Sequence, residues 1–267
     1  MVGEVRTGAG LQPQTGVLWE TLRGVVSARA QAAGRAELDV VDVGGGTGGF
    51  AVPLARLGHN VTVIDPSPDS LAAAQRRAAE AGVPLHAVQG DVPDLAGVAD
   101  ADLVLCHSVL EYVDSPQAAM AAIAAILRPG GVVSVLAASA VATVIHRVLA
   151  GRFDEARRLI EAVPVPPDHD GVAVAGGVAI SRTDKENVSL DGLPRRFTLP
   201  VVVQLIEQSG LRPGAGHGVG VFTDLVPSNL TDSDPGAVTA LLALEEAAAS
   251  HPAFRGMATQ FHVLGYR

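Results

Sequence analysis

The sequence predicts an α/β protein built on a doubly wound, mostly parallel sheet of seven strands. Short β-rich segments alternate with helical segments five times between residues 38 and 139, as in parallel sheets with right-handed crossovers. A glycine-rich stretch, DVGGGTGG (42–49), directly follows the first of these β-rich segments. A helix–strand–helix–strand tail then adds two strands, and we expect the last one to be antiparallel.

The first elements are indicated by periodicity and by their end residues. Apolar residues recur near helical spacing over 15–33, which predicts an N-terminal helix. LDVVDV (38–43) is a β-rich strand that leads into the glycines. FAVPLARLG (50–58) is the next helix, ended by its glycine, and NVTVID (60–65) is the second strand.

The middle of the alternation has clear helix-capping signals. An alanine-rich helix is predicted over 67–82, with Ser67 as N-cap and Gly82 as C-cap. LHAVQGD (85–91) and ADLVLCH (101–107) are the third and fourth strands.

Proline and glycine punctuate the rest of the core. SPQAAMAAIAAILRPGG (115–131) is predicted as a helix stopped by Pro129 and Gly130, and VVSVLAAS (132–139) as the fifth strand. Residues 141–162 have a helical pattern, whereas 163–197 lack periodicity and predict a long, functional loop. The tail is predicted as helices at 199–210 and 237–250 and strands at 216–225 and 257–267.

We expect one domain over residues 1–267. Its ligand-binding core is 38–139, the segments 1–37 and 140–200 cover that core, and 200–267 completes the sheet. In such sheets ligands bind beyond the carboxyl ends of the strands.

Composition limits the classes of function. The net charge is −9, which does not favour nucleic-acid binding, because phosphate contacts depend on clustered Lys and Arg. The apolar stretches are shorter than the roughly 20 residues of a membrane span. The single cysteine fits a reducing compartment, so we expect a cytoplasmic protein. The histidines show no metal-ligand spacing, so we predict no metal. The oligomeric state stays open.

The glycine-rich stretch satisfies two motifs. Gly44, Gly46 and Gly49 fit G-x-G-x-x-G, a fingerprint of dinucleotide binding. Asp42 with Gly44, Gly46 and Gly48 fits D-x-G-x-G-x-G, a loop that holds S-adenosylmethionine.

Carboxylates at three strand ends favour the second interpretation. Asp42 can meet the ammonium group of the ligand, Asp65 its ribose hydroxyls, and Asp91 its adenine amino group. LRPGG (127–131) marks the turn from the preceding helix into the fifth strand. An NAD-dependent oxidoreductase is the less favoured alternative.

The segments DVGGGTG, VTVID, VQGDV, HSVLEYV and ILRPGGVV occur in the order and spacing of the class I S-adenosylmethionine-dependent methyltransferases. The chain resembles that superfamily over about residues 38–139. The resemblance implies a Rossmann-like fold, a methyltransferase activity, S-adenosyl-L-methionine as methyl donor and S-adenosyl-L-homocysteine as product.

A closer resemblance extends to the tail. HSVLEYVDSP, HRVLAGRFD, VQLIEQSG, GVGVFTDL and FHVLGYR are similar to segments of the bacterial tRNA 5-carboxymethoxyuridine methyltransferases, which esterify a carboxylate on the wobble uridine of tRNA. Three departures remove positive charge. Gln14 and Gly220 stand where that family has cations, and a partly acidic insertion (164–177) replaces a lysine-rich run.

Arginines elsewhere could compensate if the fold gathers them on one face: Arg152, Arg157, Arg158, Arg182, Arg195 and Arg196. The acceptor is therefore either a carboxylate in tRNA or a small molecule methylated on O, N or C. A binding protein for S-adenosylmethionine without catalysis is the alternative of another class.

The predicted donor-binding residues surround the strand ends: Asp42, Gly44, Gly45, Gly46, Gly48, Asp65, Pro66, Gly90, Asp91, Val92, Cys106 and His107. On the acceptor side we expect His107 to act as a base or to orient the ligands. Glu111 and Tyr112 border the acceptor, or else Glu111 caps a helix and Tyr112 packs under the sheet. His262 is expected in the core or at the surface, and Glu245 and Glu246 on a solvated helix face.

Overall fold

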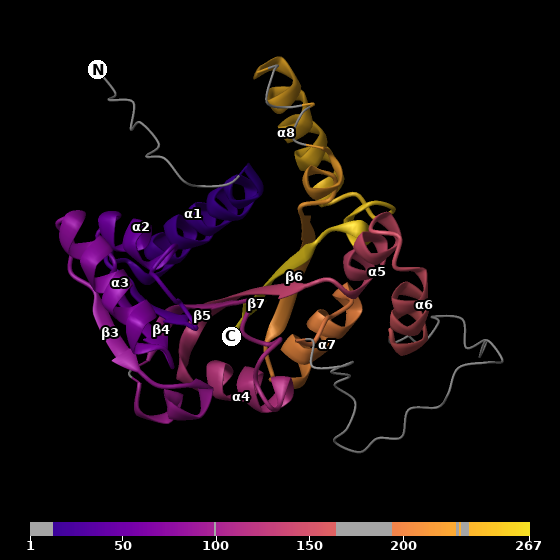
Figure 1. Cartoon of the computed structure of the whole chain (residues 1–267). Coiled ribbons are helices and arrows are strands. Elements are labelled where there is room, and N and C mark those ends of the chain that lie inside the picture. Colours follow the sequence, from indigo (N-terminus) through magenta and orange to yellow (C-terminus); the bar gives the residue numbers. More distant parts are fainter. Residues whose placement is uncertain (1–12, 99, 164–193, 228–229, 231–234) are drawn as a thin grey trace.

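A computed structural model describes residues 13–98, 100–163, 194–227, 230 and 235–267 (Figure 1). Three of the predicted features lie outside them: the insertion 164–177, Arg182 and the side chain of Gln14.

The seven strands form one sheet in the order β3-β2-β1-β4-β5-β7-β6. The strands are β1 (Asp39–Val43), β2 (Asn60–Asp65), β3 (His86–Gln89), β4 (Ala101–His107), β5 (Leu127–Ala138), β6 (Arg212–Val219) and β7 (Gln260–Tyr266). The first five pair in parallel, whereas β7 is antiparallel to both β5 and β6. The predicted sheet with an antiparallel last strand is therefore confirmed.

Helices cover both faces of the sheet (Figure 1). They are α1 (Pro13–Ala33), α2 (Ala51–Arg56), α3 (Pro68–Glu80), α4 (Pro116–Ile126), α5 (Ala140–Leu149), α6 (Phe153–Ala162), α7 (Leu199–Gln208) and α8 (Pro235–Ala249). One apolar core joins α1, α2 and α3 to Val40, Leu103 and Leu105, and the other joins α4 and α7 to Val41, Val104 and Cys106. The two sets alternate along β1 and β4 because successive side chains of a strand point to opposite faces.

Two predicted boundaries are wrong, each because pairing with a distant strand overrides the local signal. The helix predicted over 115–131 ends at Ile126, and LRPGG begins β5: Leu127 pairs with Ala101, and the Gly130 amide donates to the Arg267 carbonyl at 3.1 Å. The helical pattern at 141–162 is confirmed: it forms α5 and α6, which are separated at Gly151, where φ is 71°. The strand predicted at 216–225 is β6, which begins at Arg212 and ends at Val219.

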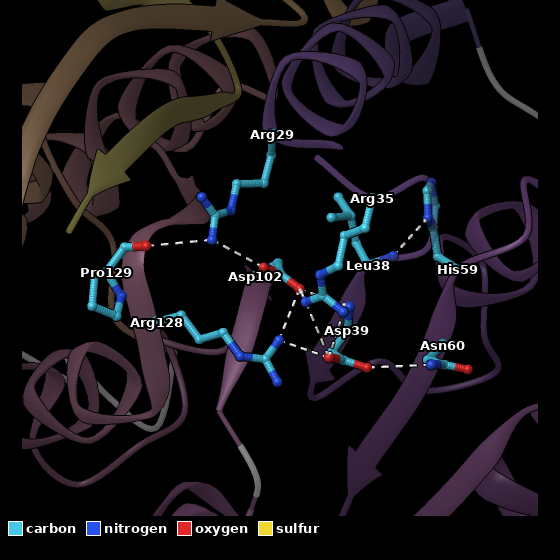
Figure 2. A network of polar contacts seen from close by, with 9 residues as sticks. All are labelled: Arg29, Arg35, Leu38, Asp39, His59, Asn60, Asp102, Arg128 and Pro129. Atoms are coloured by element: carbon cyan, nitrogen blue, oxygen red, sulfur yellow. Dashed lines mark hydrogen bonds and ion pairs between the residues drawn. The ribbon is translucent and has the colours of Figure 1, made fainter. Parts of the chain in front are cut away.

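A buried acid joins several elements at the amino edge of the sheet. Figure 2 shows Asp102 surrounded by Arg29, Arg35 and Arg128. Its carboxylate accepts from Arg29 Nη2 at 3.0 Å, from Arg128 Nη1 at 2.9 Å, from the Asp39 amide at 3.0 Å and from Arg35. This network fixes α1 to β1, β4 and the start of β5.

The prediction that Glu245 lies on a solvated helix face is wrong, because its side chain is buried. Its carboxylate is buried and accepts hydrogen bonds from the amides of Val221 at 2.8 Å, Thr223 at 2.6 Å and Phe222. It therefore holds the end of α8 that lies nearest the sheet, while the rest of α8 projects from the body (Figure 1). Glu246 is exposed, as expected.

No described helix is both long and apolar enough to cross a membrane.

Candidate functional site

Two adjoining cavities open at the carboxyl ends of the central strands. The first has a volume of about 320 Å³ and the second about 240 Å³. The first is lined by Leu18, Asp42, Gly44, Gly45, Gly49, Phe50, His107, Ser108, Leu136, Val219 and Gln260. The second is lined by Val43, Gly44, Ile64, Asp65, Pro66, Gly90, Asp91, Ser108, Val109, Tyr112 and Val113. Gly44 and Ser108 line both, so one extended ligand can lie across them.

The backbone of the glycine-rich loop distinguishes between the two motifs. Gly44, Gly46 and Gly48 have positive φ angles of 65°, 54° and 76°, whereas the φ of Gly49 is not positive. A Cβ at Gly48 would lie 3.2 Å from the Ala74 Cβ, but one at Gly49 would meet nothing within 4 Å. The three glycines that the backbone requires are those of D-x-G-x-G-x-G.

We expect Gly48→Ala to destabilise the free protein by about 1–2 kcal/mol, because a side chain in the left-handed region costs that much. The substitution should also weaken binding of the methyl donor, because the loop backbone at residue 48 must shift to accommodate the new side chain. Gly49→Ala is the matched control for stability and should leave thermal unfolding nearly unchanged, because a Cβ there would meet nothing within 4 Å. Calorimetry measures the donor affinity of Gly48→Ala against that of the wild type. Equal damage from the two variants would contradict this assignment.

Asp65 braces the loop from the end of β2. Its Oδ2 accepts from the Gly46 amide at 2.9 Å, and its Oδ1 accepts from the Ser67 amide at 2.9 Å. A carboxylate has about four lone-pair positions, so capacity remains for two hydroxyl donors from the second cavity.

Asp42 is a buried carboxyl group beneath the loop. A Cβ at Gly45 would come within 2.5 Å of its Cγ, so the loop passes directly over it. Burial, and secondarily the charge of Asp65, raises the pKa of Asp42 to about 7. A cation in the first cavity would favour its ionised form.

Asp91 has a structural task of its own. It is the N-cap of the short helix η1 (Val92–Gly97), where its Oδ1 accepts from the Val92 amide at 2.7 Å. Its own amide donates to Asp94 Oδ2 at 2.8 Å. The side chain is exposed and lines the second cavity, so capping and ligand contact are compatible.

His107, at the end of β4, lines the first cavity, and Phe50 packs edge-on against its ring at a centroid distance of 4.8 Å. Its Nε2 lies 2.8 Å from Ser134 Oγ, and that oxygen lies 2.8 Å from Nε2 of His262. Burial lowers the pKa of His107 to about 3 and, with His107 and His217 as lesser causes, that of His262 to about 3. Both rings are therefore neutral. His262 is in the core, one of its two expected positions.

Glu111 and Tyr112 lie differently. Glu111 is buried, lines neither cavity, and accepts from the Ala138 amide at 2.6 Å; its backbone carbonyl accepts from the Arg195 amide at 3.1 Å. It thus joins the β4–α4 connection to the end of β5 rather than capping a helix. Tyr112 is 72% exposed and lines the second cavity, so it does not pack under the sheet.

Other predicted donor contacts are placed around the cavities. Pro66 and Gly90 line the second cavity, whereas Gly46, Gly48, Val92 and Cys106 line neither. Residues that the motifs did not indicate are Leu18, Phe50, Ser108, Leu136, Val219 and Gln260. Leu18, Leu136, Val219 and Gln260 come from α1, β5, β6 and β7, which only the tertiary fold brings to the site, whereas Phe50 and Ser108 directly follow the glycine-rich loop and β4 in the sequence. Ser108 has a φ of 56°, and its Oγ accepts from Gln260 Nε2 at 3.1 Å.

The described residues that line the two cavities include no lysine or arginine. The arginines expected to compensate have internal contacts: Arg152 pairs with Glu155 at 3.7 Å, Arg157 with Glu161 at 3.1 Å, Arg158 donates to the Asp154 carbonyl, and Arg195 and Arg196 donate to backbone carbonyls. Gly220 stands where the resembling family has a cation. Its φ is 69°, and a Cβ there would lie 2.5 Å from Thr259 Oγ1, so the backbone at this position requires glycine.

Comparisons with known proteins identify the core. Residues 41–135 match a family described as a methyltransferase domain. The tRNA 5-carboxymethoxyuridine methyltransferase of Escherichia coli K12 is 33% identical over 148 residues, which cover 54% of this chain and 55% of that protein. A ubiquinone biosynthesis O-methyltransferase of Xanthomonas axonopodis pv. citri is 40% identical over 108 residues, 40% of this chain and 44% of that protein. The chain spans about half the length of the curated relatives it matches.

The fold extends the match to nearly the whole chain. The structure of magnesium protoporphyrin IX methyltransferase from Synechocystis PCC 6803, with bound S-adenosylhomocysteine, aligns with a TM-score of 0.55 at 15% identity. The alignment covers 97% of this chain and 90% of that one.

Proposed function

Residues 41–135 are a methyltransferase domain within a seven-stranded fold of the class I type, and from that premise we propose that the protein transfers a methyl group from S-adenosylmethionine to a small molecule. One observation supports this most directly: two cavities meet at Gly44, one over Asp42 and the other beside Asp65 and Asp91. The amino-acid and sulfonium end of the donor carries positive charge and needs a carboxylate. Its nucleoside needs hydrogen-bond acceptors for the ribose and the adenine.

The residues present fit the donor. Asp42 would neutralise the ammonium and sulfonium end in the first cavity, and the backbone at Gly44 and Gly45 admits it without a side chain. Asp65 has acceptor capacity for two ribose hydroxyls, and Asp91, which lines the second cavity, would accept from the adenine amino group.

The donor supplies a methyl group on a sulfonium, which needs no metal or protein nucleophile to activate it. The chain has to align an acceptor with that carbon and exclude water, and alignment alone can supply roughly 7–11 kcal/mol of barrier reduction. Leu18, Phe50, Leu136 and Val219 provide apolar walls for this purpose in the first cavity.

The charge of the site favours a small acceptor without a net negative charge. A carboxylate acceptor, or an anticodon stem, requires cations at the cavity or its mouth. The described lining has none; Arg152 and Arg157 are exposed and pair with nearby carboxylates of α6, and Arg195 donates to backbone carbonyls.

A second candidate is the carboxylate of a modified tRNA nucleotide. It is favoured by the 33% identity to the Escherichia coli tRNA methyltransferase, a resemblance that covers 54% of this chain. The two candidates differ in the fraction that should become labelled, metabolites or tRNA.

Gel-filtered protein should be incubated with methyl-labelled S-adenosylmethionine and either bulk tRNA or a metabolite extract. We expect label in the metabolites and none on tRNA. Label on tRNA would select the second candidate. Donor binding by calorimetry with label in neither fraction would instead indicate a binding protein without catalysis.

A further inference from the structure

A row of polar side chains crosses the sheet from the first cavity. His107 on β4, Ser134 on β5 and His262 on β7 are joined through Ser134 Oγ by two contacts of 2.8 Å. His217 on β6 is directly opposite His262 in the β6–β7 ladder and is partly exposed. Because these four strands are consecutive in the sheet, the row leads from the cavity to the far edge.

The hydroxyl group imposes a direction on the row. Ser134 Oγ has one proton, so it can donate to only one imidazole, and it can accept from the other. When Nε2 of His107 is the donor, its Nδ1 is unprotonated, Ser134 donates to His262 Nε2, and the proton of His262 is on Nδ1. His107 Nδ1 is buried and has no hydrogen-bond partner among the described residues. A buried nitrogen of this kind calls for a partner, and a bound acceptor can supply one.

Building on the proposed function, we propose that His107, Ser134 and His262 form a proton-transfer chain, and that the methyl acceptor is a hydroxyl group whose proton enters it at His107 Nδ1. A carboxylate acceptor is already ionised and needs no such chain. His107 is thus the catalytic residue, and Ser134 and His262 are positioning residues that also move the proton.

The step balances in atoms and charge. The acceptor oxygen forms a bond to the methyl carbon, the carbon–sulfur bond breaks, and its electron pair stays on sulfur. The hydroxyl proton moves to His107 Nδ1, the Nε2 proton of His107 moves to Ser134 Oγ, and the Ser134 proton moves to His262 Nε2. The positive charge lost by the sulfonium appears on His262, so the net charge of the buried site does not change.

Burial then favours release of that proton. The low pKa values of both histidines make a lasting imidazolium unfavourable, so His262 must lose its Nδ1 proton toward the partly exposed side of the row at His217. The chain is then neutral with both tautomers reversed. Before the next turnover the Nδ1 proton of His107 leaves to the emptied cavity, while a proton returns along the row from the His217 side through His262 and Ser134 to His107 Nε2.

A test that needs no acceptor is nitrogen NMR of [15N]histidine-labelled protein with S-adenosylhomocysteine bound. We expect opposite neutral tautomers, with the proton of His107 on Nε2 and that of His262 on Nδ1. Ser134→Ala should abolish this fixed pattern. Protons on both Nε2 atoms, or spectra unchanged by Ser134→Ala, would overturn the proposal.

Kinetics separate proton transfer from simple positioning. With the labelled fraction of the metabolite extract as acceptor, Ser134→Ala should lower the transfer rate roughly 100-fold, the lower end of general-base effects. Donor affinity should change less than 2-fold. His262→Gln keeps a hydrogen-bond partner for Ser134 but cannot carry the proton, so it should also be slow. A His262→Gln variant with the wild-type rate would show that the proton does not pass beyond Ser134.

The chemical nature of the product tests the acceptor class. Methyl esters release labelled methanol in mild alkali, whereas methyl ethers do not, so the labelled product should be stable. Release of methanol would overturn the assignment of a hydroxyl acceptor. If the donor binds but no extract fraction is labelled, the proposed function fails, while the NMR result still decides whether the proton chain exists.

Discussion

Asp42→Asn is expected to weaken S-adenosylmethionine binding at least 10-fold at pH 8, because it removes the one carboxylate among the described residues that line the first cavity. In the wild type the pKa of Asp42 is raised to about 7, first by burial and then by Asp65. Below pH 7 the group is a neutral acid, and above pH 7 it is a carboxylate that attracts the cationic donor. Wild-type affinity should therefore increase about 10-fold between pH 6 and pH 8, as expected for a pKa near the middle of that range.

The same substitution should stabilise the free protein. A carboxyl group whose pKa is higher in the folded state binds its proton more tightly there, so its contribution to stability falls as pH rises from about 4 through 7. Asp42→Asn removes this penalty, and its melting temperature at pH 8 should exceed that of the wild type.

Calorimetry at pH 6 and pH 8, with thermal unfolding in parallel, measures both effects of Asp42→Asn. Asp69→Asn, on the exposed first turn of α3, is the matched control and should alter neither. Wild-type affinity independent of pH, or wild-type affinity retained in Asp42→Asn, would remove Asp42 from the donor site.

The local pattern of the sequence predicted the core well. Strand ends at Asp65 and His107, the Ser67 cap and the requirement for Gly48 all depend on neighbours in sequence, and the structure has each of them. The start of β5 at Leu127 was missed, because pairing with a distant strand outweighs the helix-stopping signal of Pro129 and Gly130.

The parts of the site that were not predicted have no local signature. Val219 and Gln260 reach the first cavity only because β6 and β7 are added beside β5. The same addition brings His262 to Ser134, 128 residues away in the chain. Glu245 looked like a surface residue on an alanine-rich helix, since nothing in its neighbourhood indicates the three amides that it binds.

Asp102→Ala is expected to lower the free energy of unfolding by about 3–5 kcal/mol, the cost of removing one partner from a buried ion pair. The side chain of Asp102 is 1% exposed and that of Arg29 is 14% exposed, so the guanidinium group would be left poorly solvated and without its carboxylate (Figure 2). Arg35 and Arg128 are more exposed, at 40% and 30%, and should lose less.

Denaturant unfolding followed by circular dichroism measures this loss, and Asp100→Ala, at an exposed position two residues away, is the matched control. A loss under 1 kcal/mol for Asp102→Ala would show that the arginines find other partners or water.

The network also affects the ligand site, because Arg29 and Leu18 belong to the same helix, α1, and Leu18 lines the first cavity. Freeing the Arg29 end of α1 should therefore weaken donor binding by the folded variant, whereas a network that serves stability alone would leave that affinity unchanged.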